Sequence, residues 1–258
     1  MKLNKNDVVL FSGDSITDGD RGKSMDCNHI MGHGYQYIVA SKLALDNAEN
    51  MPKFINKGYS GEVAEGLLEK WQEDVIDNKP TILSILVGVN DGGYGYFDEI
   101  TPDEAANRHE TNLRAILEKT RNELGDIKII VCEPFYFPLD KSDYSYKNSP
   151  HPDGVEGPFK RPDSNDPEDS VAYREAANIR IRAATKKVAE EFDCIFVPLY
   201  DKIKENAERS RIEYFVWDGT HPSIAGHMII AEEKERDNKK LYIILGISAG
   251  LLSAIMII

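Results

Sequence analysis

Four short polar clusters, far apart along the chain, contain the residue types that acyl transfer requires. The first cluster holds Ser15, whose hydroxyl is a weak nucleophile until a positioned imidazole removes its proton. The last holds Asp218 and His221, three residues apart, so that the carboxylate can orient the ring and stabilise the imidazolium. These residues predict a nucleophile, a base and an orienting acid in one site.

The two clusters in between supply hydrogen-bond donors. Acyl transfer needs donors aimed at the developing oxyanion, commonly backbone N–H groups and an asparagine amide. Gly61 can bring its N–H close because it has no side chain, and Asn90 has a side-chain amide. The N–H of Ser15, at a predicted helix start, is the third candidate donor. Asp14 and Asp91 lie beside these residues and are candidates for supporting hydrogen bonds between loops.

Each cluster has an ordinary structural interpretation when it is considered alone. Asp14 and Ser15 are typical of a turn and helix cap, and Asn90 with its neighbours is typical of a turn. Gly61 suits any tight turn, and His221, before a proline, suits a surface helix entry. Their joint occurrence at predicted strand ends and before a helix favours one site over four unrelated turns.

Apolar runs and amphipathic segments alternate along the chain and thereby place these clusters. Five short apolar runs predict strands over Val8–Ser12, Lys53–Lys57, Thr81–Val87, Ile127–Cys132 and Cys194–Pro198. Helical spacing predicts helices over His33–Asn47, Glu62–Asn78, Pro102–Leu124 and Val171–Phe192, and another from about Pro222. This order predicts an α/β fold, a three-layer sandwich around a central five-stranded parallel sheet. Ligands bind beyond the carboxyl ends of such strands, where the first three clusters lie.

The segment from Phe137 to Ser170 interrupts this alternation. It carries six prolines among Asp, Ser, Asn and Lys and has no sustained period, so we expect a long loop within the domain. Loops of this length inside a compact domain are usually functional.

Composition limits the partners and the compartment. The formal net charge of −13 disfavours nucleic acid and anionic membrane surfaces as partners of the main domain. Three widely spaced cysteines form neither a disulfide framework nor a paired zinc motif, which favours the cytoplasm. The first strand begins so early that we expect no signal peptide. The glycine-rich segment 88–95 lacks the Lys-Ser/Thr of a phosphate loop, and His29 and His33 lack further ligands, so we expect neither cofactor nor metal.

Together the four clusters resemble the conserved blocks of the SGNH (GDSL-like) hydrolase family, which is named after its Ser, Gly, Asn and His. Ser15 corresponds to the nucleophile of the first block and Gly61 to the glycine of the second. Asn90 corresponds to the asparagine of the GxND block, and Asp218 and His221 correspond to the DxxH block. The resemblance spans about residues 7–231 and implies a flavodoxin-like fold.

The runs NKGYSG, ILVGVND and WDGTHPSIAGH are most similar to the bacterial carbohydrate-esterase branch that includes acetylxylan esterases. This similarity implies hydrolysis of small acyl esters of carbohydrates, acetyl esters above all, through an acyl-enzyme. The substrate would be a small-molecule or oligosaccharide ester. The chain departs from the branch at Glu62-Val63, where relatives usually carry a small polar residue and threonine, and in its longer Pro-rich loop. Ser15 is not in a Gly-x-Ser-x-Gly sequence, which disfavours the nucleophile elbow of the α/β-hydrolase fold.

Two other functions stay open at this point. A lipase, thioesterase or lysophospholipase of the same fold would use the same catalytic parts. A catalytically inactive carbohydrate-binding or scaffold protein is disfavoured because all motif residues are present. Aromatic residues near the clusters are candidates for a sugar-binding cleft, although half of them could equally lie in the core: Trp217, Tyr94, Tyr96 and Phe97. A homo-oligomer is open as well.

The end of the chain, Leu241–Ile258, is uncharged and follows two lysines. A helix of this length would span about 27 Å, enough for the hydrocarbon layer of a membrane. As an anchor it would tether a cytoplasmic enzyme to the inner face of the membrane. Alternatively, Asn238-Lys239-Lys240 and the apolar run resemble the start of a signal peptide at the wrong end, as a fusion or frameshift would leave it. A helix packed on the core is disfavoured, because the segment lacks a polar face.

We expect deletion of residues 237–258 to leave a soluble and active enzyme, because the predicted fold, residues 1–236, is complete without this tail. Solubility and ester hydrolysis of the truncated chain provide the test. An insoluble or unfolded product would show that the tail is part of the core.

Overall fold

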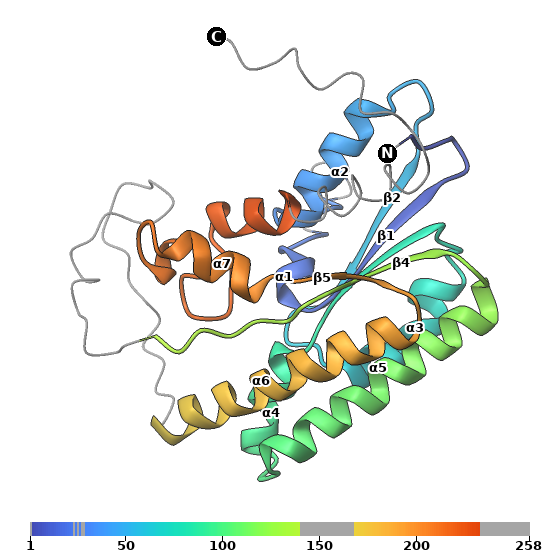
Figure 1. The fold of residues 1–258 in the computed structure, drawn as a ribbon. Helices are drawn as coiled ribbons and strands as arrows, with labels where there is room; N and C mark the ends of the chain where they lie inside the picture. Colours follow the sequence, from blue (N-terminus) through green and yellow to red (C-terminus); the bar gives the residue numbers. More distant parts are fainter. Residues whose placement is uncertain (1, 23, 25, 27–28, 140–167, 233–258) are drawn as a thin grey trace.

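The computed structural model describes residues 2–22, 24, 26, 29–139 and 168–232 (Figure 1). Most of the Pro-rich segment and the whole apolar tail, for which the sequence analysis made predictions, lie outside these residues. Among the helices of the described ranges, none has both the length and the apolar character needed to cross a membrane.

A five-stranded parallel sheet forms the centre of the fold, with the strand order β2-β1-β3-β4-β5, as the sequence predicted. The first strand, β1, lies inside the sheet. The chain adds β2 on one side of β1 and then crosses over to add β3 on the other side. The carboxyl ends of β1 and β3 therefore flank the point at which the strand order reverses, where open α/β sheets bind ligands. The strands are β1 (Val8–Gly13), β2 (Lys53–Gly58), β3 (Ile82–Leu86), β4 (Lys128–Cys132) and β5 (Ile195–Val197).

Helices cover both faces of the sheet and make three layers (Figure 1). Successive strand residues point to opposite faces, so Leu10 and Leu83 belong to one hydrophobic cluster and Phe11 and Ile82 to the other. One cluster lies under α3 (Ala64–Trp71), α5 (Pro102–Leu124) and α6 (Glu168–Glu191). The other lies under α2 (Tyr35–Asp46), α7 (Tyr200–Ala207) and the helix that begins at residue 224.

Helix α5 begins and ends where its sequence predicts. The hydroxyl of Thr101 accepts a hydrogen bond from the N–H of Glu104, and the carboxylate of Glu104 accepts one from the N–H of Thr101. This capping box, with Pro102 at the first helical position, satisfies N–H groups that have no partner inside the helix. Gly125, with φ of +68°, ends the helix.

Three helices differ from the sequence prediction, and one of them, α7, was not predicted at all. The segment predicted as one helix over Glu62–Asn78 is shorter, because α3 ends at Trp71 and a π-helical turn, Gln72–Ile76, follows. Helix α4 (Val89–Phe97) occupies a segment whose Asn-Asp-Gly sequence is equally typical of a turn. Close packing explains α4: a Cβ on Gly92 would lie 2.5 Å from Nδ2 of Asn178 in α6. The glycine costs helix propensity but allows this approach.

Candidate active site

Ser15 follows the carboxyl end of β1, an inner strand of the sheet. Gly13 ends β1 so close to β3 that a Cβ on it would lie 2.2 Å from the carbonyl oxygen of Leu86. Only glycine therefore fits here, and the next N–H, that of Asp14, donates to the same Leu86 oxygen at 3.3 Å. Asp14 caps the short helix α1 (Ser15–Asp18) by accepting a hydrogen bond from the N–H of Ile16 at 3.0 Å. This turn presents the Ser15 hydroxyl at the ligand edge of the sheet.

The three residues predicted as nucleophile, base and acid form a continuous hydrogen-bonded chain. Oγ of Ser15 lies 2.8 Å from Nε2 of His221, and Nδ1 of His221 lies 2.6 Å from Oδ2 of Asp218. The second carboxylate oxygen of Asp218 accepts the backbone N–H groups of Thr220 and His221, at 2.9 and 2.6 Å. Because Asp218 can only accept when ionised, Nδ1 carries a proton, and Nε2 is free to take the proton of Ser15.

The acid and the base tune each other. Burial by itself lowers the pKa of His221, but the hydrogen bond and charge of Asp218, with the charge of Asp14, outweigh burial and raise the pKa above 6.5. Burial raises the pKa of Asp218, but its hydrogen bonds to His221 and Thr220 outweigh this and lower the pKa below 3.8. The pair is therefore set for an ionised acid beside a base that titrates above its ordinary range.

The loops after β2 and β3 bring the predicted oxyanion donors to the same edge. Residue Gly13 of β1 pairs in register with Gly58 of β2 and with Leu86 of β3, so the three following loops leave the sheet side by side. Gly61 has φ of +81°, a conformation that favours glycine. Asn90 lies in the first turn of α4, and its Nδ2 donates to the carbonyl of Glu62 at 3.0 Å. One N–H of the amide is thereby anchored, which leaves its second N–H for a ligand.

The two supporting aspartates are buried but have different surroundings. Burial raises the pKa of Asp14 to about 7, although the N–H of Ile16 and the charge of His221 oppose the shift. Asp91 is 2% exposed and accepts the N–H of Ala64 through both oxygens at 3.3 Å. Asn90 and Asp91 therefore hold the Gly61 loop at two successive backbone groups.

His109 was not among the candidates from the sequence. It is fully buried on α5. Its Nδ1 lies 3.2 Å from a carboxylate oxygen of Asp91, but the two atoms do not form a hydrogen bond. Its Nε2 lies 2.9 Å from the hydroxyl of Thr185, which donates to the carbonyl of Ile181 at 2.8 Å. The sequence signal that could have identified His109 is its position on the face of α5 that buries Ala105 and Leu113. It lies outside every motif.

Arg174 is a second unpredicted residue, contributed by α6. Its Nη2 donates to the hydroxyl of Thr220 at 3.3 Å, and its guanidinium lies 4.6 Å from the centroid of the Tyr136 ring. The charge of Arg174 acts on His221 in the direction that lowers its pKa, against Asp218. Within the described residues, no group of three or more His, Cys, Asp or Glu side chains could hold a metal ion.

Comparisons with known proteins agree with this arrangement. The GDSL-like lipase/acylhydrolase family matches residues 11–229. An acetylxylan esterase of Geobacillus stearothermophilus is 29% identical over 235 residues, which are 90% of this chain and 93% of that protein. Its crystal structure aligns at a TM-score of 0.68 and 28% identity, covering 92% of this chain and 96% of that one. A structure described as a GDSL-like lipase from Parabacteroides merdae aligns at a TM-score of 0.73 and 29% identity, covering 92% of this chain and 98% of that one.

Crystal structures of that acetylxylan esterase include catalytic mutants in which a serine, an aspartate or a histidine is replaced by alanine. The aspartate and the histidine are three positions apart there, as Asp218 and His221 are here. The family match covers most of the length of this chain, and the structures share its fold. The chain therefore belongs to the GDSL-like lipase/acylhydrolase family and is an esterase.

Proposed function

We propose that this esterase hydrolyses small acyl esters of carbohydrates, acetyl esters above all, through an acyl-enzyme on Ser15. The observation that carries the mechanism is the unbroken chain from Ser15 through His221 to Asp218, at 2.8 and 2.6 Å. The similarity to an acetylxylan esterase along 90% of the chain supports the acetyl and carbohydrate specificity.

In the first half of the reaction, Oγ of Ser15 attacks the ester carbonyl carbon while Nε2 of His221 takes the hydroxyl proton. Negative charge develops on the carbonyl oxygen, where the N–H groups of Ser15 and Gly61 and the amide of Asn90 stabilise it. The tetrahedral intermediate collapses, and the leaving alcohol takes the proton back from His221. The acyl group stays on Ser15 as an ester.

In the second half, a water molecule gives a proton to Nε2 of His221 and attacks the acyl carbon. The same donors stabilise the second tetrahedral intermediate, and its collapse releases the acid and returns the proton to Oγ of Ser15. Asp218 stays ionised throughout and stabilises the imidazolium that forms in each half.

A lipase acting on longer acyl chains is the second candidate, because one structural neighbour is described as a GDSL-like lipase. Nitrophenyl esters of increasing acyl length, with acetylated xylo-oligosaccharides as natural-type substrates, separate the two. We expect the acetyl ester to be hydrolysed fastest and acetate to be released from the oligosaccharides. Highest activity on long acyl chains would favour the lipase.

The Ser15→Ala variant tests the nucleophile with the same substrates. We expect it to lose several orders of magnitude in turnover and to keep the fold. The matched control is Ser210→Ala, which removes an exposed hydroxyl shortly after α7, outside the four clusters. Near-wild-type turnover of Ser15→Ala would overturn the assignment of the site.

The rate should rise with pH as His221 loses its proton, because only the neutral imidazole accepts the proton of Ser15. Since the pKa of His221 is raised, the midpoint should lie above pH 6.5. Asp218→Asn removes the group that raises this pKa, so the midpoint should move to lower pH while the rate falls about a thousandfold or more.

Asp14 has a pKa of about 7 and is the control for this profile. Asp14→Asn keeps an oxygen for the N–H of Ile16 and removes the titrating carboxyl, so only a smaller downward move of the midpoint is expected. A flat profile, or a midpoint that follows Asp14→Asn but not Asp218→Asn, would contradict His221 as the base.

Asn90→Ala should lower kcat by about a hundredfold or more, as expected when one oxyanion donor is lost. The melting temperature should change little, since a single hydrogen bond to Glu62 is removed. Asn78→Ala is a control, because that amide bonds only backbone carbonyls at a helix end. If Asn90→Ala lowers the melting temperature and spares the rate, Asn90 is a turn residue.

A further inference from the structure

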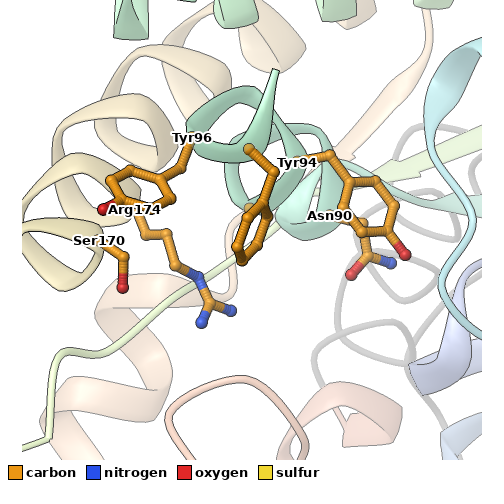
Figure 2. A pocket seen from close by; sticks show the side chains of 7 residues that line it. Asn90, Tyr94, Tyr96, Ser170 and Arg174 are labelled. Atoms are coloured by element: carbon orange, nitrogen blue, oxygen red, sulfur yellow. The ribbon is translucent and has the colours of Figure 1, made fainter. Parts of the chain in front are cut away.

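A hollow of about 110 Å³ opens beside Asn90, between α4 and the first turns of α6 (Figure 2). Besides Gly93, its lining consists of polar and aromatic side chains: Asn90, Tyr94, Tyr96, Phe97, Ser170 and Arg174. None of these residues except Asn90 belongs to the four sequence clusters.

The hollow continues the active site rather than lying apart from it. At one side, the hydroxyl of Tyr94 lies 3.1 Å from the position that a Cβ on Gly61 would take. At the other side, Arg174 donates to Thr220, the residue that precedes His221. The space therefore lies between the loop of the oxyanion donors and the loop of the base.

Helix α4 gives the hollow its length. Asn90, Tyr94 and Phe97 follow one another at helical spacing, so their side chains leave the same face of α4. The opposite face carries Gly92 and Gly95, which approach α6 closely. From Asn90 to Phe97 the helix rises about 10 Å. A substrate with its carbonyl oxygen at Asn90 thus has room along α4 for a group much longer than acetyl.

The chemistry of the lining indicates which part of the substrate this group is. Among the described residues that line it there is no Leu, Ile, Val or Met, whereas a long acyl chain would gain most from aliphatic walls. It offers instead the rings of Phe97 and Tyr94, 67% and 45% exposed, beside hydroxyls and a guanidinium. A sugar ring has both an apolar face that packs on such rings and hydroxyls that accept from arginine.

Resting on the proposed carbohydrate-ester function, we propose that this hollow binds a sugar unit on the alcohol side of the scissile ester. Phe97 and Tyr94 pack against the sugar ring, and Arg174 donates hydrogen bonds to its hydroxyls. The residues of α4 beyond Asn90 thus determine the preference for an oligosaccharide over a simple alcohol.

The test compares two acetyl esters, acetylated xylotriose and ethyl acetate, whose alcohol is too short to reach Phe97. The measured quantity is the ratio of kcat/KM for acetylated xylotriose to kcat/KM for ethyl acetate. We expect Phe97→Ala to lower this ratio about tenfold. Phe97→Trp keeps an aromatic face and should retain the ratio. Leu45→Ala, which removes an apolar side chain on α2 that is 76% exposed, should leave the ratio unchanged. Arg174 is not substituted here, because its charge also acts on His221.

Three other outcomes are informative, and each contradicts either the proposed function or the sugar-binding assignment. If the wild-type enzyme cleaves ethyl acetate but not acetylated xylotriose, the proposed function fails, and this assignment fails with it. If the wild type cleaves both esters and Phe97→Ala leaves the ratio unchanged, only the sugar-binding assignment fails. If Phe97→Ala selectively lowers activity on ethyl hexanoate relative to ethyl acetate, the hollow holds the acyl chain and the assignment is wrong.

Discussion

The close approach of β1 to its two neighbours is the constraint on which the site depends. Gly13 pairs with Gly58 and Leu86 in the same register row, and there is no space for a side chain on it. Any larger residue would push β1 away from β3 and so separate Ser15 from the α4 helix that carries Asn90. The N–H of Asp14 on Leu86 and the N–H of Tyr59 on Gly13 continue the sheet into the loops. Ser15 and the proposed oxyanion donors thereby share one rigid support.

Several carboxyls lie near His221, and their charges impose a second constraint on the site. Asp218 is stabilised as an anion by His221 and two backbone N–H groups, whereas burial raises the pKa of Asp14 to about 7 although the N–H of Ile16 donates to it. Two nearby anions would hold a proton on His221 and weaken it as a base. A carboxyl that is partly protonated near neutral pH, and the opposing charge of Arg174, limit this effect. The site thus keeps one strong anion, Asp218, where the ring needs it.

The parts of the fold that the sequence predicts are those whose signal is local. Most strands are short apolar runs, and α5 carries its own cap and stop, so the residues alone predict their bounds to within one residue. The residues of helix α4 alone do not predict it, because its glycines are needed for close packing against Asn178 and Tyr173, which lie far away in sequence. His109 and Arg174 were missed for the same reason: their roles arise from packing between helices. Acyl transfer restricts the types and the order of the serine, asparagine, aspartate and histidine, so the sequence could predict that Ser15, His221 and Asp218 come together, while their roles stay predictions.

The turn that carries the base is held from the opposite side as well. Gly219 has φ of +87°, and a Cβ on it would lie 2.4 Å from the carbonyl oxygen of Phe137. The N–H of Phe137 donates to the carbonyl of Gly219 at 2.8 Å, while Arg174 reaches Thr220 from α6. Both contacts come from the described residues that flank positions 140–167. The Asp218–His221 turn is therefore held both by Phe137, which follows β4, and by Arg174 of α6.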